Sequence, residues 1–585
     1  MKNDYIVKKL YVSFVMLSIL SALTATAGML IDNIIIGHFF GTVELGAMGV
    51  IGPVSSVFSA VGNICSGGGT TRAAQAIGTG EMKQVHAIFT ITTGFAVVMG
   101  AILSIVGLLF APQIAGFLGA TGELMQPTIE YLQGFFLGAV PTILLTMLSG
   151  FVKIDGSPKL PLLCIVVMTV SNIILDLLMV LVFRQGMFGM ALATSISYCV
   201  AVFVCCTHFL KKSNTLRLIK PEKVVYELIE MLITGAPTAM SRICDVIKIT
   251  VLNRMLSVWV GVGAVAVLNI RLQAHNFFGS LIMGFAMASV PIVGMFFGEE
   301  DRTALRDTLK ATLRIGIVSS CVVAVILFMV APGFAGMLGI TEGDNLVMAV
   351  TAIRLFSVGM PLILVNMAMM SYYQGTRNSK MASLITVLES LVFTLVFTFV
   401  MIKPLGENGV WISFLFAEIM TIVMILVCTS MHKRKLILCL DDIMRLPSGF
   451  GGNQQNRLEL SIGNSMEEVM KITNGIYQFG YERQIPKKTI YLLSLCIEEM
   501  AGNIVQHVFE RGEKRWFDLM VLDKEDSLVV RIRDNGKAFD PTKFLWDSDK
   551  NKEQHYGIRM ILGLADSVEY RRTIGLNNIL IKIRK

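Results

Sequence analysis

Long apolar stretches separated by short polar loops follow one another through about residue 430. A helix needs about 20 mostly apolar residues to cross the hydrocarbon core of a bilayer. Stretches of this kind predict twelve membrane-spanning helices, near residues 11–36, 48–76, 86–110, 126–150, 160–183, 187–210, 228–257, 262–297, 310–330, 346–371, 381–402 and 408–430. At about Arg434 the long apolar stretches stop, and charged and amide side chains become frequent. The pattern predicts a polytopic α-helical membrane protein over 1–435 with a separate C-terminal domain.

Basic residues gather in alternate loops of the predicted helical part. They are Lys2, Lys8, Lys9, Arg72, Lys83, Lys153, Lys159, Lys211, Lys212, Arg217, Lys220, Lys223, Arg302, Arg306, Lys310, Arg377, Lys380, Lys433, Arg434 and Lys435. The opposite loops are mainly acidic, with Arg184 and Lys403 as exceptions. Loops rich in Lys and Arg remain on the cytoplasmic side of a membrane. We therefore expect a multi-pass protein of the cell membrane with both termini in the cytoplasm.

Two segments of the helical part repeat each other at an offset of 220 residues. Residues 111–121 (APQIAGFLGAT) recur as residues 331–341 (APGFAGMLGIT), with seven of eleven positions identical. The same offset relates Pro141 to Pro361 and Gly189 to Gly409. Six predicted spans separate the copies, an even number, so both halves share one orientation. Parallel repeats hold a substrate cavity between two helical bundles, and we expect two six-helix repeats at about 8–215 and 225–435.

The C-terminal residues alternate between strand-like and helix-like stretches after a linker, 436–456, that contains Pro and Gly. The expected strands are 457–462, 516–522, 528–533, 568–572 and 579–583, and the expected helices are 466–479, 487–509 and 558–564. Turns at residues 523–526 and at Gly575 close two hairpins. This order predicts an α+β domain, an α/β sandwich, over 457–585.

Composition narrows the class of protein further. The chain is 54% hydrophobic and only 16% charged, with a mean hydropathy of +0.67, whereas soluble domains carry about 25% charged residues. The net charge of +8 comes largely from loops between spans, which favours a topology signal over nucleic-acid binding. The ten cysteines lack the spacing of a zinc site or a disulfide framework. Lys8 and Lys9 lead into a full span, not a cleavable signal.

Polar side chains inside the predicted spans are candidate functional groups. Asn172 and Asp176 lie four residues apart, so they share one face of a helix. Asp32 lies in an equally apolar span, and Asp32 and Asp176 would both lie roughly 13 Å below the outer ends of their helices, at about 1.5 Å per residue. Two carboxylates so close in a medium of low dielectric do not both ionise easily, so the pair suits the binding of a proton or a sodium ion. Asp32 and Asp176 match Ile249 and Phe393 in the other half, so neither has an acidic counterpart there, and the acids of that half are Asp245, Glu389, which matches Asn172, and Glu418.

The helical part, about residues 8 to 435, resembles the multidrug and toxic compound extrusion (MATE) family of secondary transporters. The resemblance rests on the repeat, on residues 31–38 (IDNIIIGH) in the first span and on the pair Asn172 and Asp176 in the fifth. In one prokaryotic branch of the family these positions form a cation site in the N-terminal lobe. The resemblance therefore implies that Asp32, Asn172 and Asp176 couple transport to H⁺ or Na⁺. It also implies export of small organic, often cationic, compounds across a bacterial cell membrane.

Three motifs of the C-terminal domain carry chemistry. Glu499 and Asn503 stand one helical turn apart, which suits water and an oxygen-liganded cation such as Mg²⁺. Asp534 and Gly536 form a turn after a strand, where the carboxylate could accept a hydrogen bond from an exocyclic amine. Gly557 opens a helix after the polar segment 543–556, and such a helix start binds phosphate well.

In this order the motifs resemble the ATP-binding (GHKL) fold of histidine kinases, gyrase and anti-sigma-factor serine kinases, the last most of all. The similarity covers about residues 455 to 585 and implies ATP and Mg²⁺ as cofactors. The implied roles are Asn503 as Mg²⁺ ligand, Glu499 as general base, Asp534 and Gly536 at the adenine, and Gly557 at the phosphates. The sequence departs from many relatives at His555-Tyr-Gly557, where one glycine replaces two or three. The resemblance therefore implies nucleotide binding more firmly than phosphate transfer.

Three functions compete. The first is a cation-coupled antiporter that exports small organic compounds by alternating access, with a cytoplasmic ATP-binding module that regulates it or signals. The alternative is a membrane-anchored protein-serine kinase of the anti-sigma type, whose transporter-like part senses a ligand. Its partner would be a cytoplasmic protein resembling an anti-sigma antagonist, or another regulatory protein. A primary ATP-driven pump is disfavoured because the sequence has no Walker loop GxxxxGK[ST].

Overall fold

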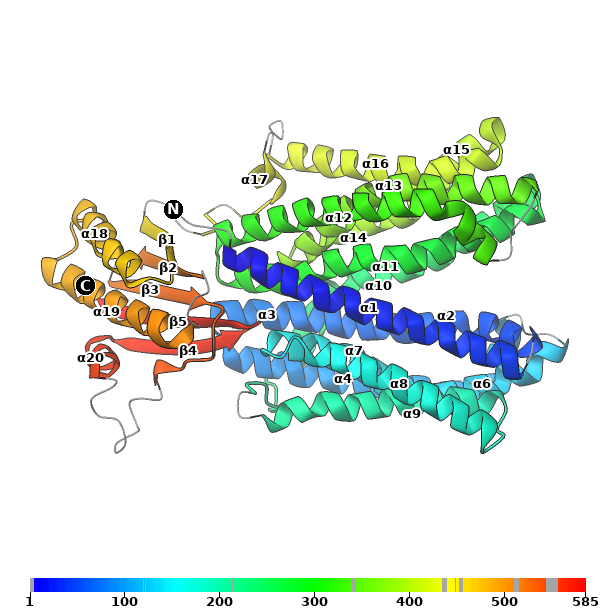
Figure 1. The fold of residues 1–585 in the computed structure, drawn as a ribbon, viewed down its shortest axis with the longest axis horizontal. Helices are drawn as coiled ribbons and strands as arrows, with labels where there is room; N and C mark the ends of the chain where they lie inside the picture. Colours follow the sequence, from blue (N-terminus) through cyan, green and yellow to red (C-terminus); the bar gives the residue numbers. More distant parts are fainter. Residues whose placement is uncertain are drawn as a thin grey trace. The chain divides into compact units, whose positions relative to one another are not determined.

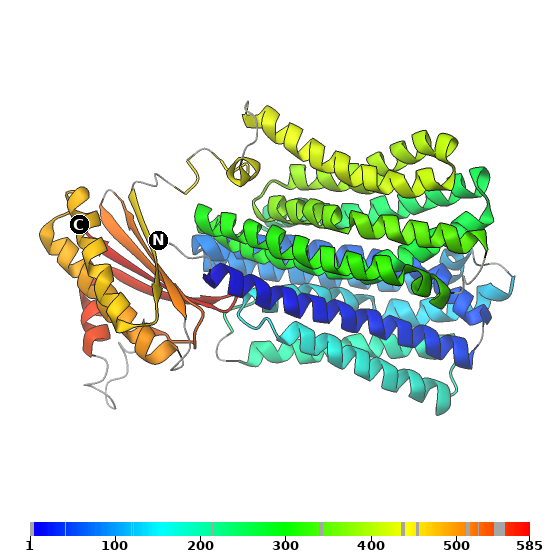
Figure 2. The same ribbon diagram turned by 45° about the horizontal axis from the view of Figure 1, so that its top comes forward.

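A computed structural model describes residues 5–40, 42–118, 120, 122–211, 214–338, 343–433, 439–447, 449–451, 456–509, 515–524, 526–542 and 556–585. By its internal contacts the chain divides into two compact units. The first is helical and spans Ser13–Lys153 and Pro158–Leu446. The second consists mainly of Pro447–Lys585 and combines a sheet with helices (Figures 1 and 2).

Long helices make up almost all of the first unit. Those of its N-terminal half are α1 (Tyr5–Phe39), α2 (Thr42–Ile64), the π-helix η1 (Cys65–Gly69), α3 (Thr70–Thr79), α4 (Met82–Leu109), α5 (Ala111–Phe117), η2 (Gly122–Leu124), α6 (Met125–Leu137), α7 (Ala139–Ile154), α8 (Leu160–Leu181), α9 (Met187–Cys206) and η3 (Thr207–Leu210). Those of its C-terminal half are α10 (Val224–Trp259), α11 (Val262–Gly298), α12 (Arg302–Met337), α13 (Asp344–Gly375), α14 (Ser379–Val387), the π-helix η4 (Leu388–Phe393), α15 (Thr394–Leu405), α16 (Glu407–Lys433) and α17 (Leu440–Ile443). Helices suit a bilayer because they satisfy their own backbone polar groups.

Nine helical segments in the described residues are long and apolar enough to cross a membrane, and the bent pair α6 and α7 makes a tenth if it is one span. These segments confirm the prediction of a polytopic helical protein. The other two expected spans, 48–76 and 228–257, fall on α2–η1–α3 and on α10, which are also helical. Arg72 lies in α3, and Glu227, Asp245 and Lys248 lie in α10. These side chains lower the hydropathy of helices whose other residues are largely apolar.

The two halves of this unit meet at equivalent residues of the repeat. Gly78 lies in α3 and Gly298 ends α11, and their numbers differ by the repeat offset of 220. A side chain on Gly78 would begin 2.7 Å from the Cα of Gly298, and one on Gly298 would begin 2.9 Å from the Cα of Gly78. Equivalent residues of two repeats meet only where the symmetry axis passes. The helices α3 and α11 therefore pack across the pseudo-two-fold axis, as parallel repeats require.

The second unit is an α/β sandwich, as predicted. Its strands are β1 (Arg457–Gly463), β2 (Trp516–Asp523), β3 (Ser527–Asp534), β4 (Ser567–Thr573) and β5 (Leu576–Arg584). They form one antiparallel sheet in the order β1-β2-β3-β5-β4. Its helices are α18 (Met466–Glu482), α19 (Lys487–Asn503), the π-helix η6 (Ile504–Val508) and α20 (Tyr556–Leu564). They pack on one face of the sheet around a core that includes Ile497, Ile532 and Ile561 (Figures 1 and 2).

The connection between the units is only partly described. The helix α17 lies within the expected linker, and the Tyr373 hydroxyl donates to the Ile443 carbonyl at 2.8 Å. Residues 436–438, 448 and 452–455 of that linker lie outside the described residues. So do residues 543–555, the polar segment expected before Gly557, and residues 119, 121 and 339–341 of the repeated motif.

Candidate functional site

The helices α1 and α8 approach each other closely beside the predicted cation site. A side chain on Gly28 of α1 would begin 3.2 Å from the Thr169 Cγ2 of α8, so the absence of a Cβ permits this approach. Asp32 follows Gly28 by one helical turn, and Asn172 and Asp176 follow Thr169 on the same face of α8. The close contact therefore directs the polar face of one helix towards that of the other.

The structure brings the three predicted residues of this site together. The Asn172 Nδ2 donates a hydrogen bond to the Asp176 Oδ2 at 3.0 Å, and the Asp32 carboxyl lies within hydrogen-bonding reach of the Asp176 carboxyl. Asp176 is fully buried. The Oδ1 atoms of Asp32 and Asp176 are buried with no hydrogen-bond partner among the described residues. Two adjacent carboxyl groups with orphaned oxygens fit an added proton or small cation.

Sequence reasoning did not find the neighbours of this pair. Tyr131 of α6 interacts with both Asp32 and Asp176 and hydrogen-bonds to Thr194 of α9. Tyr198 of α9 interacts with Asp32. The two tyrosines come from helices distant in sequence, and single aromatic residues in apolar spans carry no spacing signal. The side chains of Asn33, Ile34 and His38, part of the motif at 31–38, lie outside the described residues.

The C-terminal half holds a second, differently charged cluster. The Lys248 Nζ lies 2.7 Å from the Asp245 Oδ1 within α10. Glu389 of η4 interacts with this pair and with Glu418 of α16. The Asn366 Nδ2 donates to the Glu418 Oε2 at 2.7 Å. Sequence reasoning named the acids but not the groups that accompany them.

A buried arginine completes the C-terminal cluster. Arg271 of α11 is 5% exposed, and it interacts with Glu418. Its guanidinium lies 3.4 Å from the centre of the Phe414 ring and 5.4 Å from that of Phe356. Cations favour such aromatic faces, particularly away from water. With two basic and three acidic side chains, the cluster largely compensates its own charge.

In the second unit the three predicted nucleotide motifs converge. The Asn503 Nδ2 donates to the Glu499 backbone carbonyl at 2.7 Å and to its Oε1 at 3.1 Å. A side chain on Gly557 would begin 2.0 Å from the same Oε1. One on Gly536 would begin 2.3 Å from the Val508 Cγ1 of η6, which follows Asn503 directly. The start of α20 and the turn after β3 therefore both lie against the helix that carries Glu499 and Asn503.

Asp534 is the most buried carboxylate of this site, at 1% exposed. Its Oδ1 accepts hydrogen bonds from the Gly536 amide and from the Asn577 Nδ2, each at 2.8 Å. Burial raises the pKa of Asp534 to about 6, and these hydrogen bonds oppose the rise because they favour the charged form. Asn577 of β5 was not predicted, since it reaches the site only through the pairing of β3 with β5.

These residues fit a nucleotide with Mg²⁺ in shape and donor type. Gly536 and Gly557 let the backbone approach Val508 and Glu499 more closely than a Cβ would allow, and Asn503 offers an amide oxygen of the kind Mg²⁺ accepts. Among the described residues, no group of three or more His, Cys, Asp or Glu side chains could hold a metal ion. An Mg²⁺ ion here would therefore depend on Asn503 with water and phosphate oxygens.

Comparison with known proteins agrees with this geometry. Residues 18–178 and 237–400 match the family model MatE, and residues 464–583 match the histidine kinase-like ATPase domain. Multidrug export protein MepA of Staphylococcus aureus (strain bovine RF122 / ET3-1) is 27% identical over 395 residues, which are 65% of this chain and 85% of that protein. MepA of Staphylococcus saprophyticus subsp. saprophyticus is 27% identical over 390 residues, 66% of this chain and 84% of that protein.

Solved structures share the fold of the helical unit. An outward-facing multidrug resistance MATE family transporter of the MOP superfamily superposes with a TM-score of 0.67 at 21% identity, covering 72% of this chain and 94% of that one. A MOP superfamily transporter from Pyrococcus furiosus Vc1 (DSM3638) gives 0.67 at 21% identity, covering 72% and 96%.

Fold and matches together define a multi-pass membrane transporter that carries a C-terminal histidine kinase-like ATPase domain. The MatE model covers more than half of the sequence, and the chain belongs to the MATE family.

Proposed function

We propose that this chain is an H⁺- or Na⁺-coupled antiporter that exports small organic compounds through the cell membrane. The observation that carries the proposal is the contact between the carboxyl groups of half-buried Asp32 and fully buried Asp176, each with a buried Oδ1 that lacks a hydrogen-bond partner among the described residues. Ionisable groups inside a membrane are costly and usually functional. The pair is stable only when a proton or a cation lies between the two groups, so ion binding and release would alternate with substrate binding.

The substrate class follows from family and charge. The MepA relatives are named multidrug export proteins, and the MATE family implies organic, often cationic, substrates. A cationic substrate and a coupling ion can compensate the same carboxylates in turn. Alternating access between two parallel repeats would then expose the site to one side at a time. The positive-inside pattern supports a cytoplasmic position for both termini.

Efflux from proteoliposomes tests this proposal. The full chain is reconstituted, loaded with the fluorescent organic cation ethidium, and given an imposed proton or sodium gradient. We expect gradient-driven efflux in the wild type and in Glu130→Gln, an acid-to-amide control on α6. We expect efflux at the level of protein-free vesicles for Asp176→Asn. Equal efflux by wild type and Asp176→Asn would refute cation coupling at this pair.

The C-terminal domain would bind ATP with Mg²⁺ and regulate transport or signal. Asn503 would hold the Mg²⁺, Glu499 would act as general base, Asp534 and Gly536 would contact the adenine, and Gly557 would lie at the phosphates. The convergence of these motifs on α19 supports nucleotide binding. The alternative is a protein-serine kinase of the anti-sigma type that acts on a cytoplasmic protein partner. The nucleotide motifs that meet at α19 support this alternative as well as they support regulation.

Two readouts separate regulation from kinase activity. Mg-ATP is added on the side of the C-terminal domain, and efflux and phosphate transfer to a serine-containing partner protein are both followed. A regulatory domain changes the efflux rate in the wild type and not in Asn503→Ala. A kinase transfers phosphate, again lost in Asn503→Ala, with efflux unchanged. Lys471→Ala, on the exposed face of α18, is the matched control for both.

A further inference from the structure

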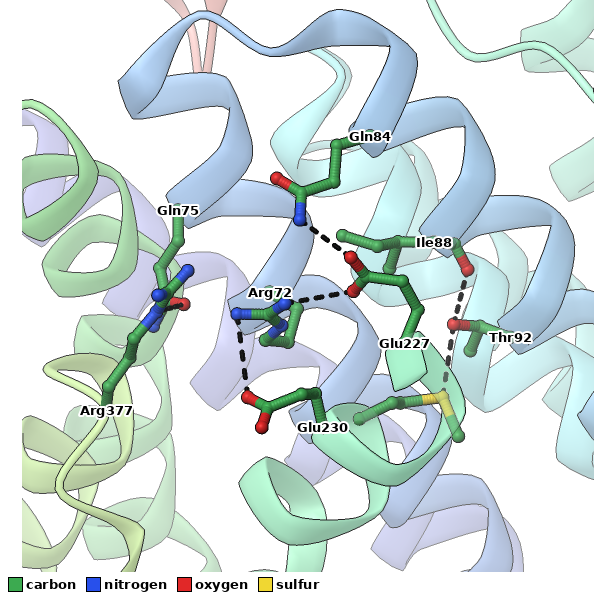
Figure 3. A network of polar contacts seen from close by, with 9 residues as sticks. Arg72, Gln75, Gln84, Ile88, Thr92, Glu227, Glu230 and Arg377 are labelled. Atoms are coloured by element: carbon green, nitrogen blue, oxygen red, sulfur yellow. Dashed lines mark hydrogen bonds and ion pairs between the residues drawn. The ribbon is translucent and has the colours of Figure 1, made fainter. Parts of the chain in front are cut away.

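A buried ion pair joins the two halves of the transporter at one end of the bundle (Figure 3). The Arg72 Nη2 of α3 lies 3.0 Å from the Glu227 Oε2 of α10, and its Nη1 lies 3.8 Å from the Glu230 Oε2. The Gln84 Nε2 of α4 donates to the other oxygen of Glu227 at 2.7 Å. Two elements of the N-terminal half thus hold one carboxylate of the C-terminal half.

A second set of contacts joins the halves beside this pair. The Gln75 Nε2, one turn beyond Arg72 on α3, donates to the Gly375 carbonyl at the end of α13 at 2.9 Å. The Arg377 Nε donates to the Gln75 Oε1 at 2.7 Å (Figure 3). Arg377 has a φ of 60°, a left-handed conformation uncommon outside glycine. The loop after α13 therefore adopts an unfavoured backbone conformation while Arg377 holds the opposite half.

Close packing removes water from the ion pair. A side chain on Gly68 of η1 would begin 2.1 Å from the Met231 carbonyl of α10, and one on Gly298 would begin 2.2 Å from the Gln75 carbonyl. The backbones of the two halves approach so closely here that Arg72 is 2% exposed and Glu227 is 6% exposed. Such a pair is stable only while both partners remain in place, because either one alone would be an uncompensated buried charge.

The fold itself does not require charges at these positions. The repeat offset of 220 relates Arg72 to Ile292 and Glu227 to Val7. These equivalents are apolar and almost fully buried, at 0% and 2% exposed. The same repeat positions therefore accept either apolar or charged side chains. The difference between them appears on separation, since water hydrates two charges well but hydrates two aliphatic side chains poorly.

We propose that Arg72 and Glu227, supported by Gln75 and Arg377, form a latch that closes this end of the transporter and opens in each transport cycle. Closed, the pair is desolvated and tightly held. Open, both charges enter water, so separation leaves no buried charge behind. The basic loops assign this end to the cytoplasm. The proposal rests on the alternating-access function above, but its test does not depend on transport.

Distances between the halves test the latch directly. Spin labels are placed at Lys83→Cys and Lys380→Cys, both exposed and on opposite halves, after replacement of the ten native cysteines. Double electron–electron resonance on the full chain in nanodiscs, without a gradient, then gives the populations of near and far states. We expect Arg72→Met to raise the ratio of far to near populations by about tenfold or more. Glu227→Gln, which keeps the side-chain shape and an acceptor for Arg72, should shift it in the same direction.

Two further variants separate a latch from a simple structural contact. Arg306→Met removes an ion pair within one half, 3.5 Å to Asp441, and should leave the distribution as in the wild type. The double variant Arg72→Ile with Glu227→Val copies the apolar residues of the other repeat. It should return the population towards the near state, because no lone charge is buried and opening would expose apolar surface. Unchanged distances in both Arg72→Met and Glu227→Gln, or a shift no larger than in Arg306→Met, would overturn the proposal.

Discussion

Replacement of Asp534 by asparagine should stabilise the ATPase domain at neutral pH while weakening nucleotide binding. Burial raises the pKa of this carboxyl from 3.8 to about 6. A raised folded-state pKa means that the folded domain prefers the protonated form. The stabilising contribution is therefore complete below pH 3.8 and is lost as the pH rises through about 6.

The size of the effect follows from the same pKa. A rise from 3.8 to about 6 corresponds to about 3 kcal/mol of folding free energy, of which about 1 kcal/mol is lost between pH 5 and pH 7. Both donors to this carboxyl, the Gly536 amide and the Asn577 Nδ2, bind its Oδ1. An asparagine carbonyl can accept both bonds, so Asp534→Asn should gain most of that 3 kcal/mol at pH 7.

Hydrogen exchange measures this locally in the full chain. The amides of the central strands β3 and β5 report opening of this domain alone, after correction for the intrinsic pH dependence of exchange. We expect their opening free energy in the wild type to fall by about 1 kcal/mol from pH 5 to pH 7, and to stay constant in Asp534→Asn. Glu467→Gln on α18 is the acid-to-amide control. The reasoning is refuted if the protection of these amides in the wild type does not fall from pH 5 to pH 7. It is also refuted if Asp534→Asn is less protected than the wild type at pH 7.

The affinity for ATP should respond to pH and to Asp534→Asn in the opposite direction from the stability of the domain. An ionised Asp534 is the better acceptor for an exocyclic amine, and hydrogen bonds to charged groups contribute about 1.5–3 kcal/mol. ATP affinity, measured by calorimetry on the full chain, should therefore fall roughly tenfold or more in Asp534→Asn. It should also fall in the wild type below about pH 6. Affinity independent of pH between pH 5 and pH 7 would contradict a direct role for this carboxylate.

Three other substitutions probe the same domain. Gly557→Val places a side chain that begins 2.0 Å from the Glu499 Oε1, and it should abolish ATP binding in calorimetry; retained affinity would exclude Gly557 from the site. Ile497→Ala empties a fully buried core position and should cost about 2–5 kcal/mol in the exchange of β3 amides; a cost near zero would contradict the packing. Asn577→Ala removes a hydrogen-bond donor that favours the ionised form of Asp534, so the pKa of Asp534 and the pH below which ATP affinity falls should both rise. An unchanged or lower pH for this fall would contradict the pKa assignment.

Much of the fold could be predicted because its determinants are local. Apolar stretches long enough to span a bilayer predicted most of the helices. Pairs of strand-like stretches joined by turns predicted the two hairpins of the second unit. The spans containing Arg72 and Glu227 are helical, as predicted, although each carries charged side chains. Hydropathy averages over all faces of a helix, whereas these charges lie on the one face that meets the other half.

The sites were predicted only where their residues are close in sequence or share a family motif. Asn172 and Asp176 are one helical turn apart, so their pairing was visible in the sequence. Arg271 and Glu418 come from α11 and α16, and only the packing of the bundle brings them together. The approach of Gly557 to Glu499 likewise depends on how α20 packs beside α19, which spacing along the chain does not determine.

The central claim is that the carboxyl pair of Asp32 and Asp176 exchanges an ion for the transported compound. The most direct measurement reverses the coupling: an ethidium gradient is imposed across proteoliposomes, and a trapped dye records the movement of H⁺ or Na⁺. The account predicts ion movement opposite to ethidium in the wild type, and none when both Asp32→Asn and Asp176→Asn are present. Ion movement of equal rate and extent in that double variant would contradict it.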